Sequence, residues 1–576
     1  MFKPWQNVTN SKSEGRDGQL GIKRASEKRD TLLILASGRV NQNLFADLGS
    51  ILTSDIPVAN TLLIQILLEN VSDRYSKIFI TLAQTKTELA SFLVNKFPNT
   101  IVYFAQPEDE IGVIVRDALT SAKSPLNQLD ILYGDTVRSS ILESDEDSDL
   151  IMGTENIESL HWDKVGRTKN GELVFYKRGD NSGEKTAISG GFRITNPQLF
   201  HSVLHKVVSD SNESDSSSAT FYQSLKIYEI ENKREFKIQE DRLWQDSGHI
   251  DTYFELRREL LSKAFRSFNS VKLSDRNQWV EKSGLQGKIE AEYKWFAGVP
   301  KEFSHYLPRI HQAASSASYS TEFLTSLPVS DMWLSDNNDD TYWLGLVDSL
   351  NMLLDDFKSV KSDERLEEVQ KSKSSIYLVK FEKRIEKLGQ LFESEGLSLD
   401  HVKLKQFTSP NTREIFENVL NVGKRISKLP HWTLMHGDMC FSNLLYERRS
   451  KGIKLIDPRG SFGAEGIYGD PLYEILKISQ CALGDYDFLA ANLYSISISG
   501  DEYTLSHLSY PSHRWQKEIF TEVLGKRANE LGVSLKDLRI LESGLFFSAA
   551  ALHKENSRFI ALTLKGIEIY LKAESS

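Results

Sequence analysis

The stretch TLLILAS, residues 31–37, is almost entirely apolar and is followed directly by Gly38. A short apolar run that ends at a turn residue indicates a buried strand. Similar runs follow, as KIFITLA (77–83), TIVYFAQ (100–106) and LDILYGD (129–135). Helical periodicity separates these runs, in 61–71, 87–97 and 113–122. Strands that alternate with helices of about ten residues predict βαβ units around a parallel sheet.

The composition is that of an ordinary globular protein, with 40% hydrophobic and 26% charged residues. A length of 576 residues is too great for one core and suggests about three or four domains. The 70 basic and 80 acidic residues give a net charge of −10, and no long Lys/Arg block indicates a nucleic-acid surface. The two cysteines, Cys440 and Cys481, exclude a disulfide framework and a Cys-rich zinc site.

The same features predict a cytoplasmic protein that is not inserted in a membrane. So few cysteines favour a reducing compartment. No run of 18 apolar residues occurs, and the N-terminus lacks the apolar core of a signal peptide. The oligomeric state stays open, a homo-oligomer included.

A second informative stretch is MHGDMCFSNLLY, residues 435–446, where Asp438 and Asn443 stand in an otherwise apolar run. Their Asp-x₄-Asn spacing is that of a kinase catalytic loop, in which the aspartate is the base and the asparagine is a metal ligand. Fourteen residues after Asn443, the apolar run IKLI ends in Asp457. A carboxylate at a strand end beside such a loop is the expected second ligand for Mg²⁺, which prefers oxygen.

HGDMCFSN and IDPRG together resemble the aminoglycoside phosphotransferase / choline kinase branch of the protein-kinase-like fold. The resemblance covers roughly residues 265–576. It implies an α+β kinase-like C-terminal domain that transfers a phosphoryl group from ATP, with Mg²⁺, to a hydroxyl group. It also implies that Asp438 is the catalytic residue and that Asn443 and Asp457 are the metal ligands.

The same resemblance implies further members of the kinase site. QWVEKSG offers Lys282 for the phosphates, and KIEAEYKWF offers Glu292, or else Glu290, as its partner on a helix. YSTEFL (319–324) is expected to be the hinge beside the adenine, and RSFNSVKLS stands where a glycine-rich loop is usual. Asp470, in YGDPLYEILKIS, is expected to stabilise the catalytic loop.

Three stretches of the first half, LLILASGR, LYGDT and LWQDSGH, resemble in this order the sugar-phosphate nucleotidyltransferases. The resemblance covers about residues 30–265 and implies a Rossmann-like (GT-A-like) α/β domain. It implies that Asp135 and Asp246 jointly hold Mg²⁺ between the nucleotide and the sugar phosphate. Two carboxylates on one cation offset the negative charge that converges when one phosphate attacks another.

The resemblance also implies nucleotide contacts by Gly38 and Arg39, by Gly112 near the base, and by Lys177. It leaves CTP, GTP, UTP and dTTP open as the nucleotide. The sequence departs from the family pattern, because the first loop lacks the second glycine and Pro57 is not followed by the usual lysine. Each lost charge-assisted contact is worth about 1.5–3 kcal/mol.

Three interpretations of the N-terminal half follow from this departure. It is a divergent but active nucleotidyltransferase, a module that binds a nucleotide or sugar nucleotide without transfer, or a structural remnant that positions the kinase. The retained Asp135 and Asp246 argue mildly against a remnant.

The predicted organisation is a flexible arm (1–28), a nucleotidyltransferase-like domain (29–265), a kinase-like N-lobe (266–335) and a helical C-lobe (336–576). The main hypothesis is a bifunctional enzyme that phosphorylates a sugar or alcohol and then activates it with a nucleotide for a surface polysaccharide such as capsule. Its small-molecule substrate is a sugar, a sugar phosphate or an amino alcohol. The alternatives are an active kinase with a non-catalytic nucleotide-sugar-binding module, and a kinase that phosphorylates an aminoglycoside antibiotic.

Overall fold

The computed structural model describes residues 28–575, with gaps at 123–125, 138–147, 155–160, 181–185, 212–218, 242–243, 264–268, 274–278, 313–316, 337–338, 408–410 and 500–501. The chain forms two compact units. Unit 1 consists of Met1–Phe45, Ser50–Ile56 and Leu62–Leu256, and unit 2 consists of Ala46–Gly49, Pro57–Thr61 and Arg257–Ser576.

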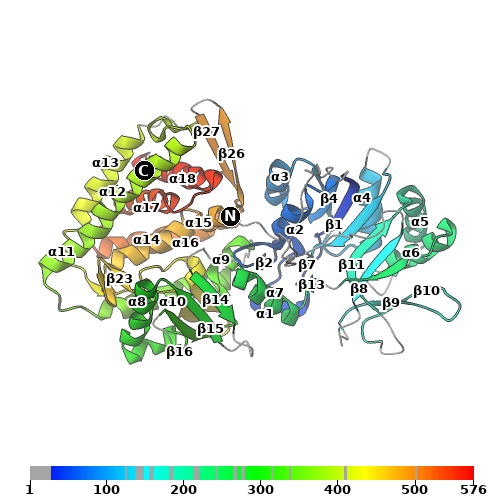
Figure 1. Ribbon diagram of the computed structural model, residues 1–576, viewed down its shortest axis with the longest axis horizontal. Helices are drawn as coiled ribbons and strands as arrows, with labels where there is room; N and C mark the ends of the chain where they lie inside the picture. Colours follow the sequence, from blue (N-terminus) through cyan, green and yellow to red (C-terminus); the bar gives the residue numbers. More distant parts are fainter. Residues whose placement is uncertain are drawn as a thin grey trace, which may run out of the picture. The chain divides into compact units, whose positions relative to one another are not determined.

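Unit 1 is built on a nine-stranded sheet whose centre is parallel (Figure 1). β1 (Arg29–Leu35) pairs in parallel with β4 (Tyr75–Ala83) on one side and with β6 (Leu129–Tyr133) on the other, and β5 (Thr100–Ala105) continues the sheet beyond β4. β11 (Thr186–Ile194) runs antiparallel to β6 and extends the sheet on that side. The remaining strands are β8 (Leu150–Thr154), β9 (Lys164–Arg167), β10 (Leu173–Tyr176) and β12 (Lys237–Glu240).

The order of the parallel strands places helices on both faces of the sheet. From β1 the chain moves outward through β4 to β5, and it then returns to β6 on the other side of β1. Right-handed crossovers therefore put α2 (Leu63–Val71) and α3 (Thr87–Lys96) on one face and α4 (Ile111–Ser121) on the other (Figure 1). The strand order reverses between β1 and β6. In open α/β sheets, ligands bind beyond the carboxyl ends of the strands at this kind of switch point.

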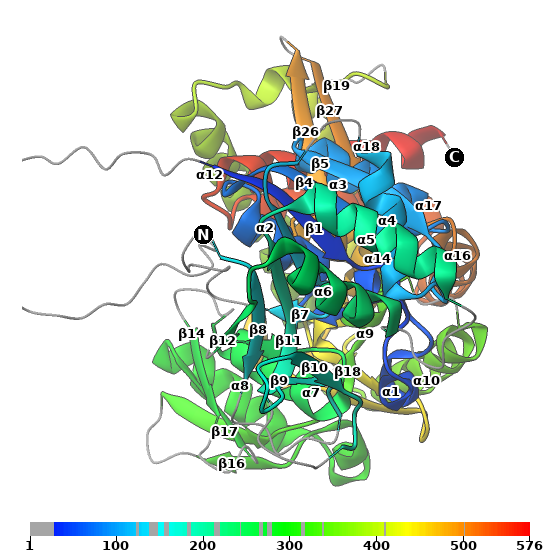
Figure 2. The ribbon, with the colours of Figure 1, turned by 90° about the vertical axis from the view of Figure 1, so that its right-hand side faces the viewer.

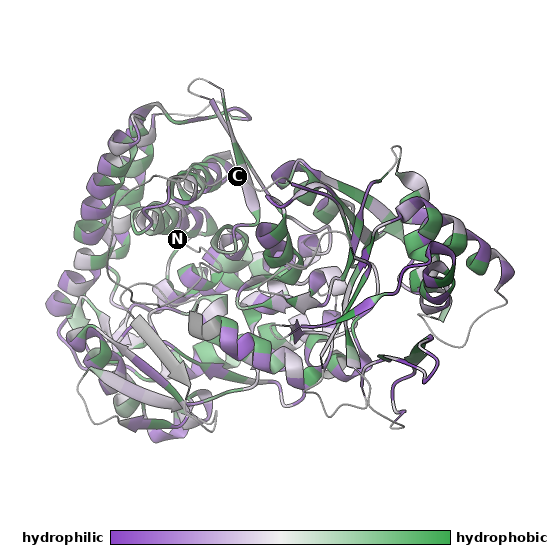
Figure 3. Ribbon diagram, turned by 45° about the vertical axis from the view of Figure 1, so that its right-hand side comes forward, coloured by the Kyte–Doolittle hydropathy of each residue, from purple (hydrophilic) through white to green (hydrophobic). Residues whose placement is uncertain are grey.

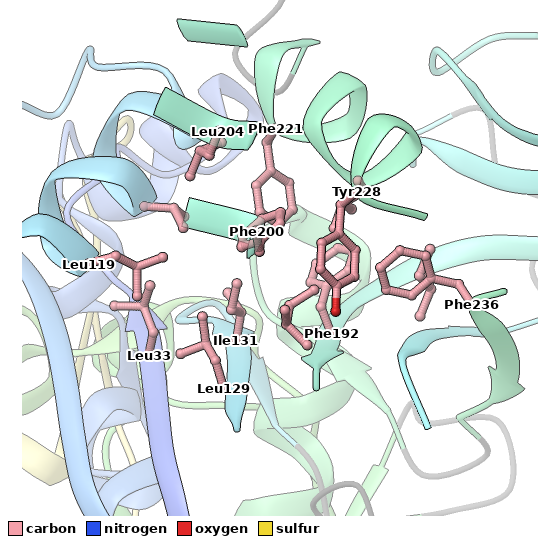
Figure 4. Close-up of a cluster of buried hydrophobic side chains, with 14 of the residues drawn as sticks. Leu33, Leu119, Leu129, Ile131, Phe192, Phe200, Leu204, Phe221, Tyr228 and Phe236 are labelled. Carbon is pink, nitrogen blue, oxygen red and sulfur yellow. The ribbon is translucent and has the colours of Figure 1, made fainter. Parts of the chain in front are cut away.

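The main core of unit 1 lies between the sheet and three helices, α4, α5 (Pro197–Asp210) and α6 (Ala219–Asn232) (Figure 2). Leu33 and Ile131 point from the central strands toward aromatic rings from β11 and both later helices (Figure 4). Alternate residues of β1, such as Leu32 and Ile34, are also buried, as expected for a strand covered on both faces.

Unit 2 begins with a four-stranded antiparallel sheet in the order β14 (Asn269–Leu273), β15 (Trp279–Gly284), β17 (Ser318–Glu322), β16 (Ile310–Gln312). Helix α8 (Gln286–Gly298) packs against β15 and β17. A hairpin of β21 (Leu444–Glu447) and β22 (Gly452–Leu455) also pairs with β18 (Leu327–Pro328).

The rest of unit 2 is mainly helical; several helices show one hydrophobic and one hydrophilic face (Figure 3), whereas nearly all residues of α14 (Pro471–Ala482) are buried. One turn, Ser375–Val379 (η4), is a π-helix that leads directly into α12 (Lys380–Ser394). The other helices of eight residues or more are α10 (Asp340–Ser359), α11 (Leu366–Ser374), α13 (Thr412–Ile426), α14 (Pro471–Ala482), α16 (His513–Glu530), α17 (Leu535–Ala550) and α18 (Asn556–Ser575). Helix α7 (Ile250–Lys263) spans the boundary between the units.

The predicted alternation of strands and helices, and the parallel sheet, are confirmed for unit 1. The predicted arm at 1–28 and most of the Ser-rich insertion at 209–220 lie outside the described residues, as does part of RSFNSVKLS (266–274). In the part of the chain that the structure describes, no helix is long and apolar enough to cross a bilayer.

Candidate active sites

Unit 2 contains a cavity of about 710 Å³ that collects the residues predicted for the kinase site. Apolar side chains line part of it, among them Val280, Phe296, Leu445 and Ile456. The lining also includes every predicted polar residue, namely Lys282, Glu292, Asp438, Asn443 and Asp457. Predicted residues as far apart in sequence as Lys282 and Asp457, which are 175 positions apart, therefore line one cavity.

Lys282, on β15, contacts both Glu292 of α8 and Asp457. Its ammonium group lies 2.6 Å from the carboxylate of Glu292 on α8 and also contacts Asp457. Burial by itself lowers the pKa of Lys282, but the Asp457 and Glu292 carboxylates raise it above its usual range. Glu292 is fully buried, whereas Glu290 is exposed and pairs with the next turn of its own helix. The structure therefore selects Glu292 as the partner of Lys282.

The backbone of the loop around Asp438 is held by two buried side chains. The Nε2 atom of His436 lies 3.0 Å from the Ile456 carbonyl, and its Nδ1 accepts the Asp438 N–H at 3.3 Å. Burial lowers the pKa of His436 to about 4, so the ring is neutral. Glu474 accepts the N–H groups of His436 and Gly437, the latter at 2.8 Å. A neutral ring can accept a hydrogen bond through Nδ1 and donate one through Nε2. His436 therefore holds the loop through both nitrogens.

Asp470 does not have the contacts that the sequence predicted. Its carboxylate accepts the Leu472 N–H and caps α14, and it binds Lys373 at 2.9 Å and the Tyr377 hydroxyl at 3.0 Å. It is Glu474, one helical turn later, that bonds the catalytic-loop backbone. A longer side chain, on the helix face that meets the loop, is needed to reach those two N–H groups.

Asp438 faces the cavity with 41% of its side chain exposed, and it forms an ion pair with Lys477 at 2.9 Å. Burial acts to raise the pKa of Asp438, but the Lys477 ammonium group lowers it to about 2. Asn443 donates to the Asp438 carbonyl at 2.9 Å, which fixes the turn between the two residues. A carboxylate of such low pKa stays ionised and can accept a hydrogen bond from an acceptor hydroxyl.

The hairpin of β21 and β22 brings Asn443 and Asp457 together. Leu444 pairs with Leu455, and the Ile456 N–H donates to the Asn443 carbonyl at 3.1 Å. Asp457 follows with φ +57°, a left-handed conformation that turns its side chain off the strand, and 42% of that side chain is exposed. Carboxylate and amide oxygens on neighbouring strand ends fit the preference of Mg²⁺ for hard ligands.

Unit 1 brings Asp135 and Asp246 together at the switch point of its sheet. Asp135 follows β6, and β13 (Gln245–Asp246) pairs with β7 (Thr136–Val137), which places Asp246 opposite Thr136. A Cβ added to Gly248 would lie 2.7 Å from an Asp135 oxygen and 3.3 Å from an Asp246 oxygen. Gly248 therefore leaves room for both carboxylates. Burial, and then the neighbouring Asp246, raise the pKa of Asp135 to about 7.

Asp246 is held in place by the first turn of α7. Its Oδ2 atom lies 2.7 Å from the Nδ1 atom of His249 and accepts the Thr252 hydroxyl at 2.7 Å. The His249 ring packs against Trp162, with centroids 4.8 Å apart. Burial alone would lower the pKa of His249, but the bond to Asp246 raises it above its usual value. Within the described residues, no group of three or more His, Cys, Asp or Glu side chains is arranged to hold a metal ion.

The other residues predicted for unit 1 lie in different settings. Gly38 follows β1 at the same edge of the sheet as Asp135, and its carbonyl accepts the Thr53 N–H. Arg39 is exposed and pairs with Glu108 at 3.1 Å. Lys177 is exposed just beyond β10.

Gly112 lies within α4, where an added Cβ would collide with the Thr220 hydroxyl of α6. Helix packing accounts for the absence of a side chain at this position, and its contact with a nucleotide base stays a prediction.

The sequence analysis missed Glu474, which bonds the backbone of the Asp438 loop, and four cations that line the same cavity as Asp438, namely Lys380, Arg384, Arg459 and Lys477. Lys380 and Arg384 are one turn apart in a helix that reads as ordinary and amphipathic. Only the fold turns them into the cavity. The available signal was that Glu474 and Lys477 are charged residues within an otherwise apolar stretch, YEILKIS.

No protein-family model matches the chain, and no curated protein matches it. Among solved structures, the inositol-1-phosphate CTP transferase of T. maritima is 15% identical, with a TM-score of 0.33, and the match covers 42% of this chain and 98% of that one. A putative glucose-1-phosphate thymidylyltransferase of Bacillus anthracis is 12% identical, with a TM-score of 0.33, and the match covers 41% of this chain and 98% of that one. The CTP:phosphocholine cytidylyltransferase LicC of Streptococcus pneumoniae is 12% identical, with a TM-score of 0.31, and the match covers 40% of this chain and 99% of that one.

These matches fall on the N-terminal part of the chain, whose parallel-centred α/β sheet is described above. Identities and TM-scores this low carry no information about substrate or activity. The chain is similar, over about two fifths of its length, to solved nucleotidyltransferases.

Proposed function

We propose that unit 2 is an ATP-dependent phosphotransferase with a protein-kinase-like fold and a hydroxyl acceptor. The observation that carries the proposal is the meeting of Lys282, Glu292 and Asp457 in one ion-pair cluster, in the cavity that also exposes Asp438 and Asn443. Phosphoryl transfer requires a cation for the donor phosphates, oxygen ligands for a metal, and a carboxylate for the acceptor hydroxyl. The cavity supplies all of these, and its apolar walls can accept an adenine ring.

Each residue has a definite task in this reaction. Lys282, held by Glu292, binds the donor phosphates, while Asn443 and Asp457 hold Mg²⁺, which neutralises charge on the transferred group. Asp438 accepts a hydrogen bond from the acceptor hydroxyl and orients its oxygen toward the γ-phosphorus. Because the pKa of Asp438 is about 2, orientation is its main contribution, and the proton passes on to water after transfer.

The test is ATP-dependent phosphorylation in a screen of hydroxyl compounds, comparing the wild type with Asp438→Ala. We expect a loss of at least about 10²-fold in kcat, because the acceptor hydroxyl is no longer oriented toward the γ-phosphorus, with little change in the KM for ATP. A variant that keeps full activity would rule out the assignment of Asp438.

For unit 1 we propose a divergent nucleotidyltransferase in which Asp135 and Asp246 hold the metal. A phosphate oxygen of the substrate would bond to the α-phosphorus of a nucleoside triphosphate, the bond to the β-phosphate would break, and pyrophosphate would leave. The support is the convergence of two carboxylates on Gly248 at the switch point of the sheet. Release of pyrophosphate, assayed across CTP, GTP, UTP and dTTP with sugar phosphates, should be lost in Asp135→Asn and Asp246→Asn.

A second candidate for unit 1 is a module that binds a nucleotide or nucleotide sugar without transfer. Two observations favour it. The Arg39 guanidinium group is already paired with Glu108. The stretch where the family has Pro-Lys, Pro57–Thr61, belongs to unit 2, where the Asn60 N–H donates to Asp331 at 3.2 Å. Saturable binding of a nucleotide sugar with no pyrophosphate release by the wild type would establish this alternative.

The two proposed activities form a coherent pair, because the phosphorylated product of unit 2 is the class of substrate that unit 1 uses. Together they would make a nucleotide-activated sugar or alcohol, a precursor for a surface polysaccharide. Feeding the purified protein with ATP, a second nucleotide and an unphosphorylated acceptor tests the pair directly. The expected product contains the acceptor linked to a nucleoside diphosphate.

A further inference from the structure

The cavity of unit 2 is much more basic than a protein of net charge −10 would lead one to expect. Its charged lining consists of eight basic side chains, Arg257, Arg258, Lys282, Lys288, Lys380, Arg384, Arg459 and Lys477, and four acidic ones, Glu292, Glu322, Asp438 and Asp457. Three of the acidic groups are already neutralised. Glu292 and Asp457 contact Lys282, and Asp438 contacts Lys477.

Four of these cations form no ion pair among the described residues; one of them, Arg258, lies over the Phe323 ring. The other three are Lys380, Arg384 and Arg459. The one hydrogen bond from their charged groups joins Arg459 to the Tyr473 hydroxyl, at 3.2 Å. Other buried lysines of unit 2, such as Lys373, are paired with carboxylates. Unpaired and partly buried cations are costly, so proteins generally keep them for a ligand.

The three cations lie close to one another and to the catalytic loop. Lys380 and Arg384 are one turn apart on α12, so their side chains share one helix face. The Arg459 N–H donates to the His436 carbonyl, and its Cβ is the atom that leaves no room for a side chain at Gly437. The Arg459 guanidinium group also lies over the Tyr473 ring, 5.5 Å from its centre.

The backbone just before Lys380 helps to direct its side chain into the cavity. The π-helical turn Ser375–Val379 ends immediately before it, and such turns are often found at functional sites. The Tyr377 hydroxyl binds Asp470, which fixes the turn to the start of α14. The groups that face Lys380 are Tyr473, Arg459, Arg384 and Lys477, and all but Tyr473 are cations. Burial and then these cations lower the pKa of Lys380 to about 8.

We infer that Lys380, Arg384 and Arg459 form a subsite for an anionic group on the acceptor, so that unit 2 phosphorylates a hydroxyl compound that already carries a phosphate or a carboxylate. This inference rests on the proposed kinase function. The acceptor oxygen forms the new bond to the γ-phosphorus of ATP, the bond to the β,γ-bridging oxygen breaks, and ADP leaves with that electron pair. The hydroxyl proton passes by way of Asp438 to water. The anion, held by the three cations, positions the hydroxyl beside Asp438.

The basic subsite also argues against a cationic acceptor. An aminoglycoside or an amino alcohol would bring further positive charge next to Lys380, Arg384 and Arg459, with no free carboxylate among the described lining residues to receive it. Bringing like charges close together in a partly buried site is strongly unfavourable. The basic cavity therefore argues against the alternative that unit 2 phosphorylates an aminoglycoside antibiotic.

The first experiment measures binding of inorganic phosphate to the full-length protein by calorimetry at pH 7, without ATP. The variant is Lys380→Met with Arg384→Met, and the matched control is Lys383→Met with Lys387→Met, which changes two exposed lysines on the same helix. We expect at least tenfold weaker phosphate binding in the first variant and wild-type binding in the control. Equal binding by all three proteins would overturn the inference.

The second experiment compares acceptors in matched pairs. Polyols and sugars are assayed with ATP in neutral, amino, phosphate and carboxylate forms, and the last two arms distinguish the sources of the anion. We expect turnover of an anionic form, and an increase of at least tenfold in its KM, with an unchanged KM for ATP, in Lys380→Met/Arg384→Met. If only the KM for ATP rises, the cations hold the nucleotide and the inference is wrong.

The two experiments separate failure of the inference from failure of the proposed function. Turnover of neutral acceptors that is insensitive to the double substitution would refute the anionic subsite and leave the kinase standing. Phosphate binding that depends on Lys380 and Arg384, with no ATP-dependent transfer to any acceptor, would refute the kinase and leave the anion site standing.

Discussion

Replacing Lys380 by Met should make the protein more stable while it weakens acceptor binding. Burial, and to a smaller extent the surrounding cations, lower the pKa of this lysine from 10.5 to about 8. Each pKa unit corresponds to about 1.36 kcal/mol, so holding the charge costs the folded protein at most about 3.4 kcal/mol. Solvent screening of a partly exposed side chain reduces this to roughly 1–2 kcal/mol. Methionine keeps the apolar stem and removes the charge.

The sign of the pH dependence follows from the same shift. Below pH 8 the lysine is protonated in both the folded and the unfolded protein, and the cost is fully present. Between pH 8 and about 10.5 the folded lysine loses its proton first, so the cost disappears as the pH rises. The advantage of Lys380→Met should therefore be largest at neutral pH and should vanish near pH 10.5.

Thermal unfolding monitored at several pH values measures this effect. For a large domain, a gain of 1–2 kcal/mol corresponds to a rise of roughly 2–8 °C in Tm. The control is Lys383→Met, an exposed lysine of the same helix, for which no rise is expected. Adding phosphate should stabilise the wild type more than the variant and narrow the difference. A Lys380→Met protein that is no more stable than the control at pH 7 would refute the proposed cost of holding this charge in a half-buried site among other cations.

Three further predictions follow from the described contacts. Glu474→Ala should leave the N–H groups of His436 and Gly437 without an acceptor, which costs about 1–3 kcal/mol each. We expect a lower Tm and a lower kcat. An unchanged kcat would show that other contacts hold the loop. Gly112→Ala should push α4 away from Thr220 and destabilise unit 1 by about 1–3 kcal/mol, measured by urea unfolding. The control is Gly389→Ala, a position within α12 where an added Cβ meets open space, for which no destabilisation is expected. The affinity for sulfate, whose charge is constant over this range, should fall as the pH rises above about 8 because Lys380 loses its proton, and calorimetry that shows a flat profile would contradict this.

Much of the candidate kinase site could be foreseen, because its key residues lie in short motifs with fixed spacing. The Asp-x₄-Asn spacing and the strand that ends in Asp457 depend on local backbone geometry, which a single hairpin reproduces in the structure. The partner of Lys282 was narrowed to two glutamates of one helix. The choice of Glu292 needed the direction of that helix against the sheet, which no local pattern contains.

The role expected for Asp470 was wrong for a related reason. The resemblance of YGDPLYEILKIS to the kinase family implied that Asp470 supports the loop, yet its carboxylate caps α14 and binds Lys373 and Tyr377. The support comes from Glu474, and only the packing of α14 against the loop decides which of the two acids reaches it.

By itself the sequence determined the alternation of strands and helices in unit 1, because buried strands and amphipathic helices have different periods. It also indicated two of the candidate metal ligands, Asp135 and Asp457, because each closely follows an apolar strand. Only the tertiary structure decided the character of the cavity. Lys380 and Arg384 on one helix, and Arg459 on a distant loop, meet without a counter-ion. Charge repulsion between residues so far apart in sequence exists only after folding brings them together, and so it leaves no local pattern to read.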